Sequence, residues 1–238
     1  MRGIEAFDPC QAILVVAAHA DDLETMCGGT LIQLLAQGKA VDLLLATDGD
    51  LGTSDPSLER PTLAALRRAE ARRAGEALGL GGVRFLGYHD GELVNDLKLR
   101  EEVAYAYRLL QPDTIFTFDP LAAYRTNLHP DHIAVSQAAI DAFMPAKMGL
   151  YHPEHLSGSV QLSRVKQIFF FLTAEPDVVV PIDAVYPQKL AASMIHESQF
   201  PKGEESLEWM KGRDRAMAAR HAGEGTEYAE GFRSLTTY

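Results

Sequence analysis

Short apolar runs alternate along the chain with longer segments in which apolar residues recur at helical spacing. The runs cover residues 13–17, 41–47, 83–86, 114–118, 168–172 and 178–180. They are rich in Val, Ile, Leu and Phe, which is typical of parallel strands covered on both faces of a sheet. We therefore expect these runs to be buried strands.

The segments between the runs have the lengths and end signals of helices. They cover residues 26–37, 61–78, 97–110, 132–143, 187–198 and 206–221. Gly38 and Gly79 lie where two helices should stop, and Pro61 suits a first helical turn. The alternation predicts a doubly wound, mostly parallel α/β sheet of the Rossmann-like class, with helices on both faces and a single domain of residues 1–238. Residues 144–165 should form a long functional loop, and residues 223–231 a Gly-rich tail.

Composition and charge exclude several classes of protein. The 238 residues carry 22 basic and 33 acidic side chains, a net charge of −11. Nucleic acid or an anionic membrane would need a local basic patch, but the four arginines of residues 67–73 share their segment with Glu70 and Glu76. Two cysteines without C-x-x-C spacing argue against a disulfide scaffold. With no apolar run of ~18 residues and no secretory signal, the expectation is a cytoplasmic protein with no nucleic-acid partner and no membrane insertion.

The loop after the first predicted strand reads AHADDLE over residues 18–24. A dinucleotide-binding protein would have G-x-G-x-x-G here, and two adjacent carboxylates would instead repel a phosphate and attract a cation. His19 and Asp22 are three residues apart, so one turn can bring both side chains to the same ion. Asp21 should then point toward a water molecule on that ion. The alternative is that the two acids only cap the following helix.

The loop after the fourth predicted strand contains HPDH at residues 129–132. His132 can complete a His/Asp/His ligand set with the first loop, which leaves a position open for water. Asp131 can orient an imidazole through its second nitrogen. The alternative is that His129 and His132 are ordinary loop residues and Asp131 caps a helix. Because both loops follow strands of a doubly wound sheet, we expect them at the same edge.

Three other features have less specific interpretations. HPEH at residues 152–155 copies the second motif, but no predicted strand ends beside it, so a pocket rim is expected there. Asp90 follows the third strand and can contact substrate, or it can belong to a plain Asp-Gly turn. Arg67 and Glu70 have the spacing of a surface ion pair on a helix.

Together these residues resemble the LmbE-like, or PIG-L, family of zinc-dependent N-acetylglucosaminyl deacetylases. The first family motif is similar to residues 18–24 with CGGTL at 27–31, and the second is similar to HPDH about 110 residues later. Weaker similarities cover most of the chain: Arg67 with Glu70, residues 85–93, Ile182 with Asp183, Lys189, and HESQ at 196–199.

The resemblance implies a metal centre and assigns roles to its residues. Three side chains would hold one zinc ion, or another divalent metal, per chain: His19, Asp22 and His132. Asp21 would be the general base. His129, paired with Asp131, would assist at the oxyanion or at the leaving amine.

The resemblance also implies a substrate and an assembly. Arg67 would bind substrate and Asp90 would contact the sugar, and the reaction would remove acetate from N-acetylglucosamine joined to another group. Many members of the family are homo-oligomers. The chain departs from the family at Ala20, where proline is usual, and lacks an aromatic residue just before the second motif, for which Tyr124 is a substitute.

Two alternatives to this function follow from the same residues. One is a metal-dependent hydrolase of a different amide or ester. A two-metal phosphoesterase is a poorer match, because it needs more carboxylate and histidine ligands than the three counted here. The other is a non-catalytic metal-binding or sugar-binding protein of the same fold. The sequence assigns no role to His152, His155 or His196.

Overall fold

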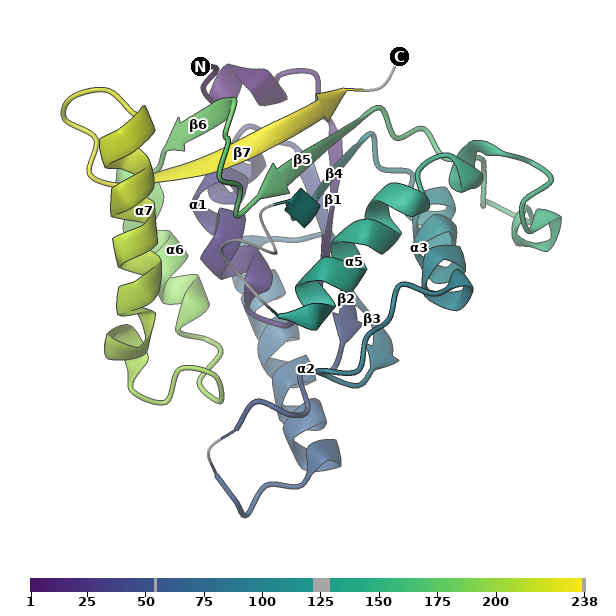
Figure 1. Cartoon of the computed structure of the whole chain (residues 1–238), viewed down its shortest axis with the longest axis horizontal. Coiled ribbons are helices and arrows are strands. Elements are labelled where there is room, and N and C mark those ends of the chain that lie inside the picture. The colour runs from purple at the N-terminus through teal and green to yellow at the C-terminus, as the bar shows by residue number, and fades with distance from the viewer. Residues whose placement is uncertain (54, 122–128, 237–238) are drawn as a thin grey trace.

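One twisted sheet forms the centre of the molecule (Figure 1). The computed structural model describes residues 1–53, 55–121 and 129–236. Within these residues seven strands pair in the order β3-β2-β1-β4-β5-β7-β6. Their bounds are β1 Ala12–Ala17, β2 Ala40–Thr47, β3 Gly82–Tyr88, β4 Thr114–Phe118, β5 Gln167–Phe171, β6 Val178–Pro181 and β7 Ala229–Thr236.

The sheet is mostly parallel, as the sequence predicts. β3, β2, β1, β4 and β5 pair in parallel, whereas β7 runs antiparallel between β5 and β6. The strand β7 corrects the expected Gly-rich tail of residues 223–231. Its first three residues include a charged residue and a glycine, Glu230 and Gly231. Such residues interrupt the apolar run from which a strand is predicted.

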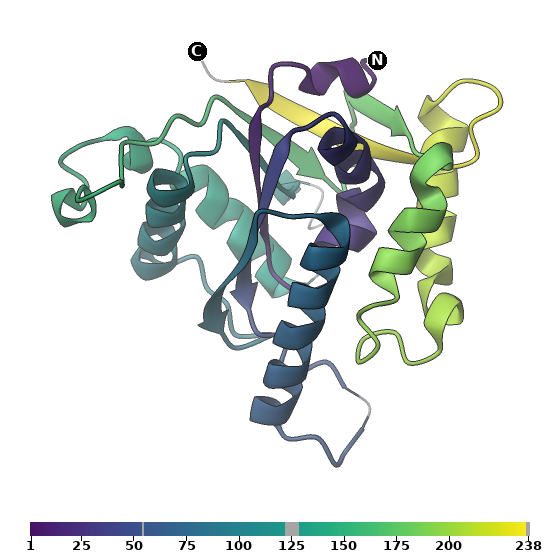
Figure 2. The ribbon, with the colours of Figure 1, turned by 180° about the vertical axis from the view of Figure 1, so that it is seen from behind.

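Helices cover both faces of the sheet, which confirms the predicted fold class. Their bounds are α1 Asp22–Ala36, α2 Arg60–Leu78, α3 Leu97–Leu110, α5 Pro130–Asp141, α6 Tyr186–Ser193 and α7 Glu208–His221. α3 and α5 pack together over the face turned to the viewer in Figure 1. α1, α2 and α6 pack over the other face, seen from the front in Figure 2. None of the described helices is long and apolar enough to cross a membrane.

The helix bounds differ from the expected ones mainly around the polar loops. α1 begins at Asp22 rather than at residue 26, because its first turn is polar but nevertheless buried. α6 ends at Ser193, so the expected helix end at residue 198 is wrong and the last residues of that range form turns. Polar residues that serve a site do not follow the apolar spacing from which helices are predicted.

A buried lysine connects the added strand to the helices. Lys189 of α6 donates to Asp214 Oδ2 at 2.5 Å and to Glu230 Oε1 at 2.8 Å. Glu230 accepts in turn from the backbone N–H groups of Gly29 and Thr30 in α1. The network therefore links α1, α6, α7 and β7, and it positions the helix that begins at the first candidate loop.

The strand order fixes where a ligand site can form. β1 lies between β2 and β4, so the chain leaves β1 toward one side of the sheet and reaches β4 on the other. In doubly wound sheets ligands bind beyond the carboxyl ends of the strands at such a switch point. The loop after β1 and the start of α5 after β4 meet at this edge (Figure 1).

Candidate metal centre

The first loop is closed by its own second carboxylate. Asp22 Oδ2 accepts hydrogen bonds from the backbone N–H groups of Ala18 at 3.0 Å and His19 at 2.7 Å. Asp21 is the N-cap residue of α1, but its side chain makes no capping hydrogen bond with the described backbone. The capping alternative is therefore wrong for Asp21, whose half-buried carboxylate lines the site instead.

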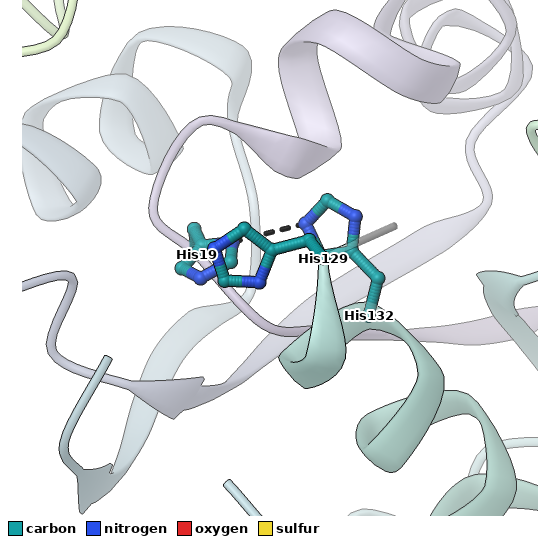
Figure 3. A group of neighbouring side chains, drawn as sticks. All are labelled: His19, His129 and His132. Carbon is teal, nitrogen blue, oxygen red and sulfur yellow. Dashed lines mark hydrogen bonds between the residues drawn. The ribbon is translucent and has the colours of Figure 1, made fainter. Parts of the chain in front are cut away.

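The structure brings the three predicted ligands together. His19 Nδ1 lies 3.0 Å from His132 Nε2, and a dashed line marks this contact in Figure 3. Asp22 places Oδ2 3.7 Å from His19 Nδ1 and Oδ1 3.4 Å from His132 Nε2. Ligands at the usual zinc distance in a tetrahedral site are about 3.4 Å from each other. The three side chains lie close together, but Asp22 faces the two histidines with different oxygens. The groups of described residues at this site in which one donor atom from each lies within 4.8 Å of the others contain His129: one is His19, His129 and His132, and the other is His19, Asp90, His129 and Asp131.

The opposite nitrogen of His19 faces carboxylates. His19 Nε2 lies 3.2 Å from Asp90 Oδ1 and 3.4 Å from Asp131 Oδ2. A histidine that ligates a metal through one nitrogen almost always donates its other N–H to a carboxylate, a carbonyl or a water molecule. The surroundings of His19 have this arrangement, with Nδ1 on the side of His132.

Asp131 has a different partner from the one expected. Its carboxylate accepts from the backbone N–H groups of Gly91 at 2.7 Å and Leu93 at 3.1 Å and faces His19. The expected pairing of this carboxylate with His129 is corrected accordingly. The contact between the two residues is a backbone one, in which Asp131 N–H donates to His129 Nδ1 at 3.3 Å. His129 is therefore the side-chain cap of α5, and Asp131 is not.

The carboxylates give the site a negative potential. Burial alone would lower the pKa of His19, but hydrogen bonds with Asp131 and Asp90 raise it to about 10. Burial alone would raise the pKa of Asp90, but the hydrogen bond with His19 lowers it to about 2. Burial and the Asp22 carboxylate raise the pKa of Asp21 above its ordinary range. A positive charge is strongly favoured at this point, and a divalent cation supplies it.

A pocket of about 250 Å³ opens over the candidate ligands. It is lined by His19, Asp21, Asp22, Met26, Gly52, Arg67, Asp90, His129, His132, Gln199 and Trp209. All the site residues expected from the sequence line it except Asp131, which lies behind His19. Met26, Gly52 and Trp209 were not expected. Trp209, the only tryptophan of the chain, comes from α7, whose position the sequence does not reveal.

Arg67 reaches this pocket from α2. Its guanidinium donates to the carbonyl oxygens of Gly49 and Gly52, both at 2.6 Å, and to Gln199 Oε1. The side chain is buried. The alternative of a surface pair with Glu70 is therefore wrong, because both side chains are buried and Arg67 makes its hydrogen bonds to the loop after β2 and to Gln199.

The segment of residues 196–199 packs behind the first loop. His196 and Glu24 are both buried, with Nε2 and Oε2 3.2 Å apart. Glu70 Oε1 and Oε2 accept from the backbone N–H of Ser198 at 2.9 Å and from its hydroxyl at 2.6 Å. These contacts fix Gln199 beside Arg67. They give a structural reason for the similarity of residues 196–199 to the family.

Two further expectations concern residues away from the pocket lining. The HPEH segment of residues 152–155 was expected at a pocket rim. It packs against α3, where Glu154 and His155 line a cavity of about 430 Å³. None of its residues lines the pocket over the candidate ligands. Tyr124, the expected aromatic substitute, lies outside the described residues.

The chain is similar to known deacetylases over most of its length. The sequence model of the PIG-L family, described as GlcNAc-PI de-N-acetylase, matches residues 14–143. Diacetylchitobiose deacetylase of Thermococcus kodakarensis is 31% identical over 96% of this chain and 85% of that protein. A probable N-acetyl-alpha-D-glucosaminyl L-malate deacetylase 2 of Bacillus cereus is 30% identical over 79% of this chain and 83% of that protein.

A solved structure extends this similarity to the fold. The structure of N,N'-diacetylchitobiose deacetylase from Pyrococcus horikoshii, complexed with its inhibitor MPG, has a TM-score of 0.88 and 29% sequence identity. The match covers 97% of this chain and 85% of that chain. The residues matched by the family model include both loops of the candidate metal centre, from His19 to His132.

Proposed function

The chain belongs to the PIG-L family, and from that premise we propose that it is a metal-dependent N-deacetylase of small molecules containing N-acetylglucosamine. The reaction hydrolyses the acetamido C–N bond and releases acetate and a free amine. One observation carries the proposal. Two imidazole nitrogens lie 3.0 Å apart with the Asp22 carboxylate within 3.7 Å of both, and a second carboxylate, Asp21, lines the same pocket and is not used as a cap.

The metal of this centre would be held by His19 Nδ1, His132 Nε2 and the Asp22 carboxylate, and each chain would bind one zinc ion there. Such a ligand set leaves a coordination position open for chemistry. A bound zinc ion supplies a strong water nucleophile near neutral pH and positive charge for the carbonyl oxygen. Asp131 and Asp90 would not touch the metal; they would orient the His19 ring by accepting a hydrogen bond from Nε2.

Asp21 is the proposed general base. It is adjacent to a proposed ligand and lines the pocket, and its carboxylate is free of the capping role that Asp often has at a helix start. It would accept a proton from the attacking water as the new C–O bond forms. The proton must later pass to the nitrogen of the breaking C–N bond, either from Asp21 or from His129.

His129 is placed to donate a hydrogen bond. Because Nδ1 accepts the backbone N–H of Asp131, the neutral ring carries its proton on Nε2. That nitrogen lies 3.6 Å from Asp90 Oδ1, on the pocket side of the centre. The Nε2–H group would stabilise the negative charge that develops on the carbonyl oxygen. To protonate the leaving amine, the ring would first have to take up a second proton and act as the imidazolium.

The sugar would be bound by neutral and charged hydrogen-bonding groups in the same pocket. Arg67 and Asp90 are the proposed contacts, and Trp209 adds an aromatic surface. A second cavity of about 440 Å³ shares Met26 and Trp209 with this pocket. It provides room for the group to which the sugar is joined.

Other features of the proposal rest on the sequence. The homo-oligomeric assembly, the cytoplasmic location and the single catalytic domain of residues 1–238 stay predictions. A hydrolase of another amide or ester, and a non-catalytic binding protein, are the competing functions.

The proposal is tested with a panel of acetylated compounds. The purified protein, stripped of metal and then supplied with zinc, is mixed with several N-acetylglucosaminides, an N-acetyl amino acid and an O-acetyl sugar, and primary amine and acetate are measured. We expect amine release from at least one N-acetylglucosaminide, only with metal. Full activity in verified metal-free protein would exclude the mechanism. Acetate release from the other compounds alone would favour a different hydrolase, and no release from any compound would favour the binding protein.

A further inference from the structure

A second group of potential metal ligands lies beside α3. It consists of Glu101 from that helix and of His152, Glu154 and His155 from the loop after α5, and one ligand atom from each lies within 4.8 Å of the others. None of these residues lines the pocket over the first centre. In Figure 1 this loop occupies the edge of the molecule next to α3.

The donor atoms are spaced as ligands of one ion. Glu101 Oε1 lies 3.4 Å from His152 Nδ1 and 3.2 Å from His155 Nε2. These separations match the spacing of about 3.4 Å between neighbouring ligands in a tetrahedral zinc site. Glu154 Oε1 lies 2.7 Å from His152 Nδ1, so this carboxylate is at hand as a fourth ligand.

The chemistry of the group suits a transition metal. Imidazole together with carboxylate is a common ligand set for zinc and similar divalent ions. Two carboxylates balance the charge of one divalent cation. The two imidazole rings lie nearly parallel, with centroids 5.1 Å apart and planes at 16°, and both present a nitrogen to the same Glu101 oxygen.

A buried arginine holds the loop in this position. Arg108 of α3 is completely buried and donates to the carbonyl oxygens of Pro145, Ala146, Met148 and His152. The loop is thereby attached to α3 through its backbone, independently of the ligand side chains. Donors that are placed in advance lose less conformational entropy when they bind an ion.

The backbone of His152 supports the same interpretation. Its φ of 45° and ψ of 65° lie in the left-handed region, which residues with a side chain rarely adopt. This conformation begins the short turn Pro153–His155 and directs both imidazoles toward Glu101. A groove of about 430 Å³ lined by Glu101, Tyr105 and His155 gives ions from solvent access to the group.

We propose that Glu101, His152 and His155, with Glu154 beside them, form a second metal site that binds zinc or a similar divalent transition metal. An ion at this site links α3 to the loop of residues 144–156 and is separate from the ion of the deacetylase centre.

The test counts zinc ions in untagged protein. Wild type, Glu101→Gln and the control Glu102→Gln are stripped of metal, reloaded with zinc, freed of loose ions by gel filtration and analysed by elemental analysis. Glu102 is the adjacent glutamate on α3, but it contacts Tyr88 and Lys98 and belongs to no ligand group among the described residues. We expect Glu101→Gln to bind one ion fewer than wild type, and Glu102→Gln to bind the same number.

A third variant separates this site from the first centre. His19→Ala removes a proposed ligand of the deacetylase centre, and it should keep the ion held by Glu101, whether or not the first centre binds metal. His155→Asn provides a second substitution in the new site and should lose the same ion as Glu101→Gln. The proposal is overturned if Glu101→Gln binds as many ions as wild type, if Glu102→Gln loses the ion as well, or if His19→Ala binds none.

Discussion

The Nδ1 atom of His19 faces the Nε2 atom of His132 at 3.0 Å, although 113 residues separate them in the chain. The pair forms because β1 and β4 are neighbours in the sheet, with Val15 opposite Phe116. The loop after β1 and the first turn of α5 therefore meet at the same edge. Two ring nitrogens that face each other so closely require a proton or a cation between them, and the nearby Asp22 carboxylate favours a cation.

The Asp131 carboxylate should raise the metal affinity of the centre without touching the ion. Asp131→Asn weakens the hydrogen bond to His19 Nε2, and substitutions of this kind typically lower metal affinity or activity about 10–100-fold. Zinc affinity is measured by competition with a chelator. Asp141→Asn is the matched control, because Asp141 lies in the same helix and faces Asn95 and Arg100 near the surface. Equal affinities for the two variants would show that Asp131 does not orient His19.

Arg67 should act on the substrate and not on the metal. Arg67→Lys keeps the positive charge but cannot bridge the carbonyls of Gly49 and Gly52 and Gln199. Loss of one hydrogen bond to a charged group is worth about 1.5–3 kcal/mol, so kcat/KM should fall about 10-fold or more while zinc content stays at the wild-type level. Arg68→Lys, next to it but bonded to Asp48, is the control and should leave kcat/KM unchanged. A wild-type kcat/KM for Arg67→Lys would remove this residue from substrate binding.

Lys189 should be important for stability. Lys189→Met leaves two buried carboxylates, Asp214 and Glu230, without their shared cation, and breaking a buried pair costs about 3–5 kcal/mol of the free energy of unfolding. Lys202→Met removes an exposed pair with Glu205 and should cost less than about 1 kcal/mol. Urea denaturation of both variants measures the difference. Similar losses for the two variants would contradict the proposed importance of the buried network.

The sequence predicts most of the sheet, because its parallel strands are continuous apolar runs. It does not predict β7, in which Glu230 and Gly231 occupy buried positions. A buried glutamate is stable there because Lys189 of α6 and two backbone N–H groups of α1 donate hydrogen bonds to it. The start of α1 is missed for a related reason, since Asp22 is buried and polar and hydropathy gives it no weight.

The sequence also predicts the residues of the site better than their partners. His19 and Asp22 are three residues apart, so the local backbone conformation alone brings their side chains together. The partner of Asp131 is not local, because it depends on how the loop after β3 packs against α5. Trp209 belongs to the pocket only because α7 packs beside α1, and no feature of its own segment indicates that position.

In the proposed mechanism two adjacent carboxylates have different roles, with Asp22 a metal ligand and Asp21 the general base. Asp22 faces both histidines, whereas Asp21 lines the pocket and makes no side-chain cap within the described residues. Asparagine is similar in size to aspartate but cannot accept the proton. The most direct measurement is therefore zinc content together with kcat for Asp21→Asn and Asp22→Asn.

For Asp21→Asn we predict the wild-type number of zinc ions and a kcat lower by about 10²–10⁴-fold, the usual contribution of a general base. For Asp22→Asn we predict one zinc ion fewer per chain than in wild type. Loss of the ion from Asp21→Asn, or full activity of Asp21→Asn, would contradict these two roles.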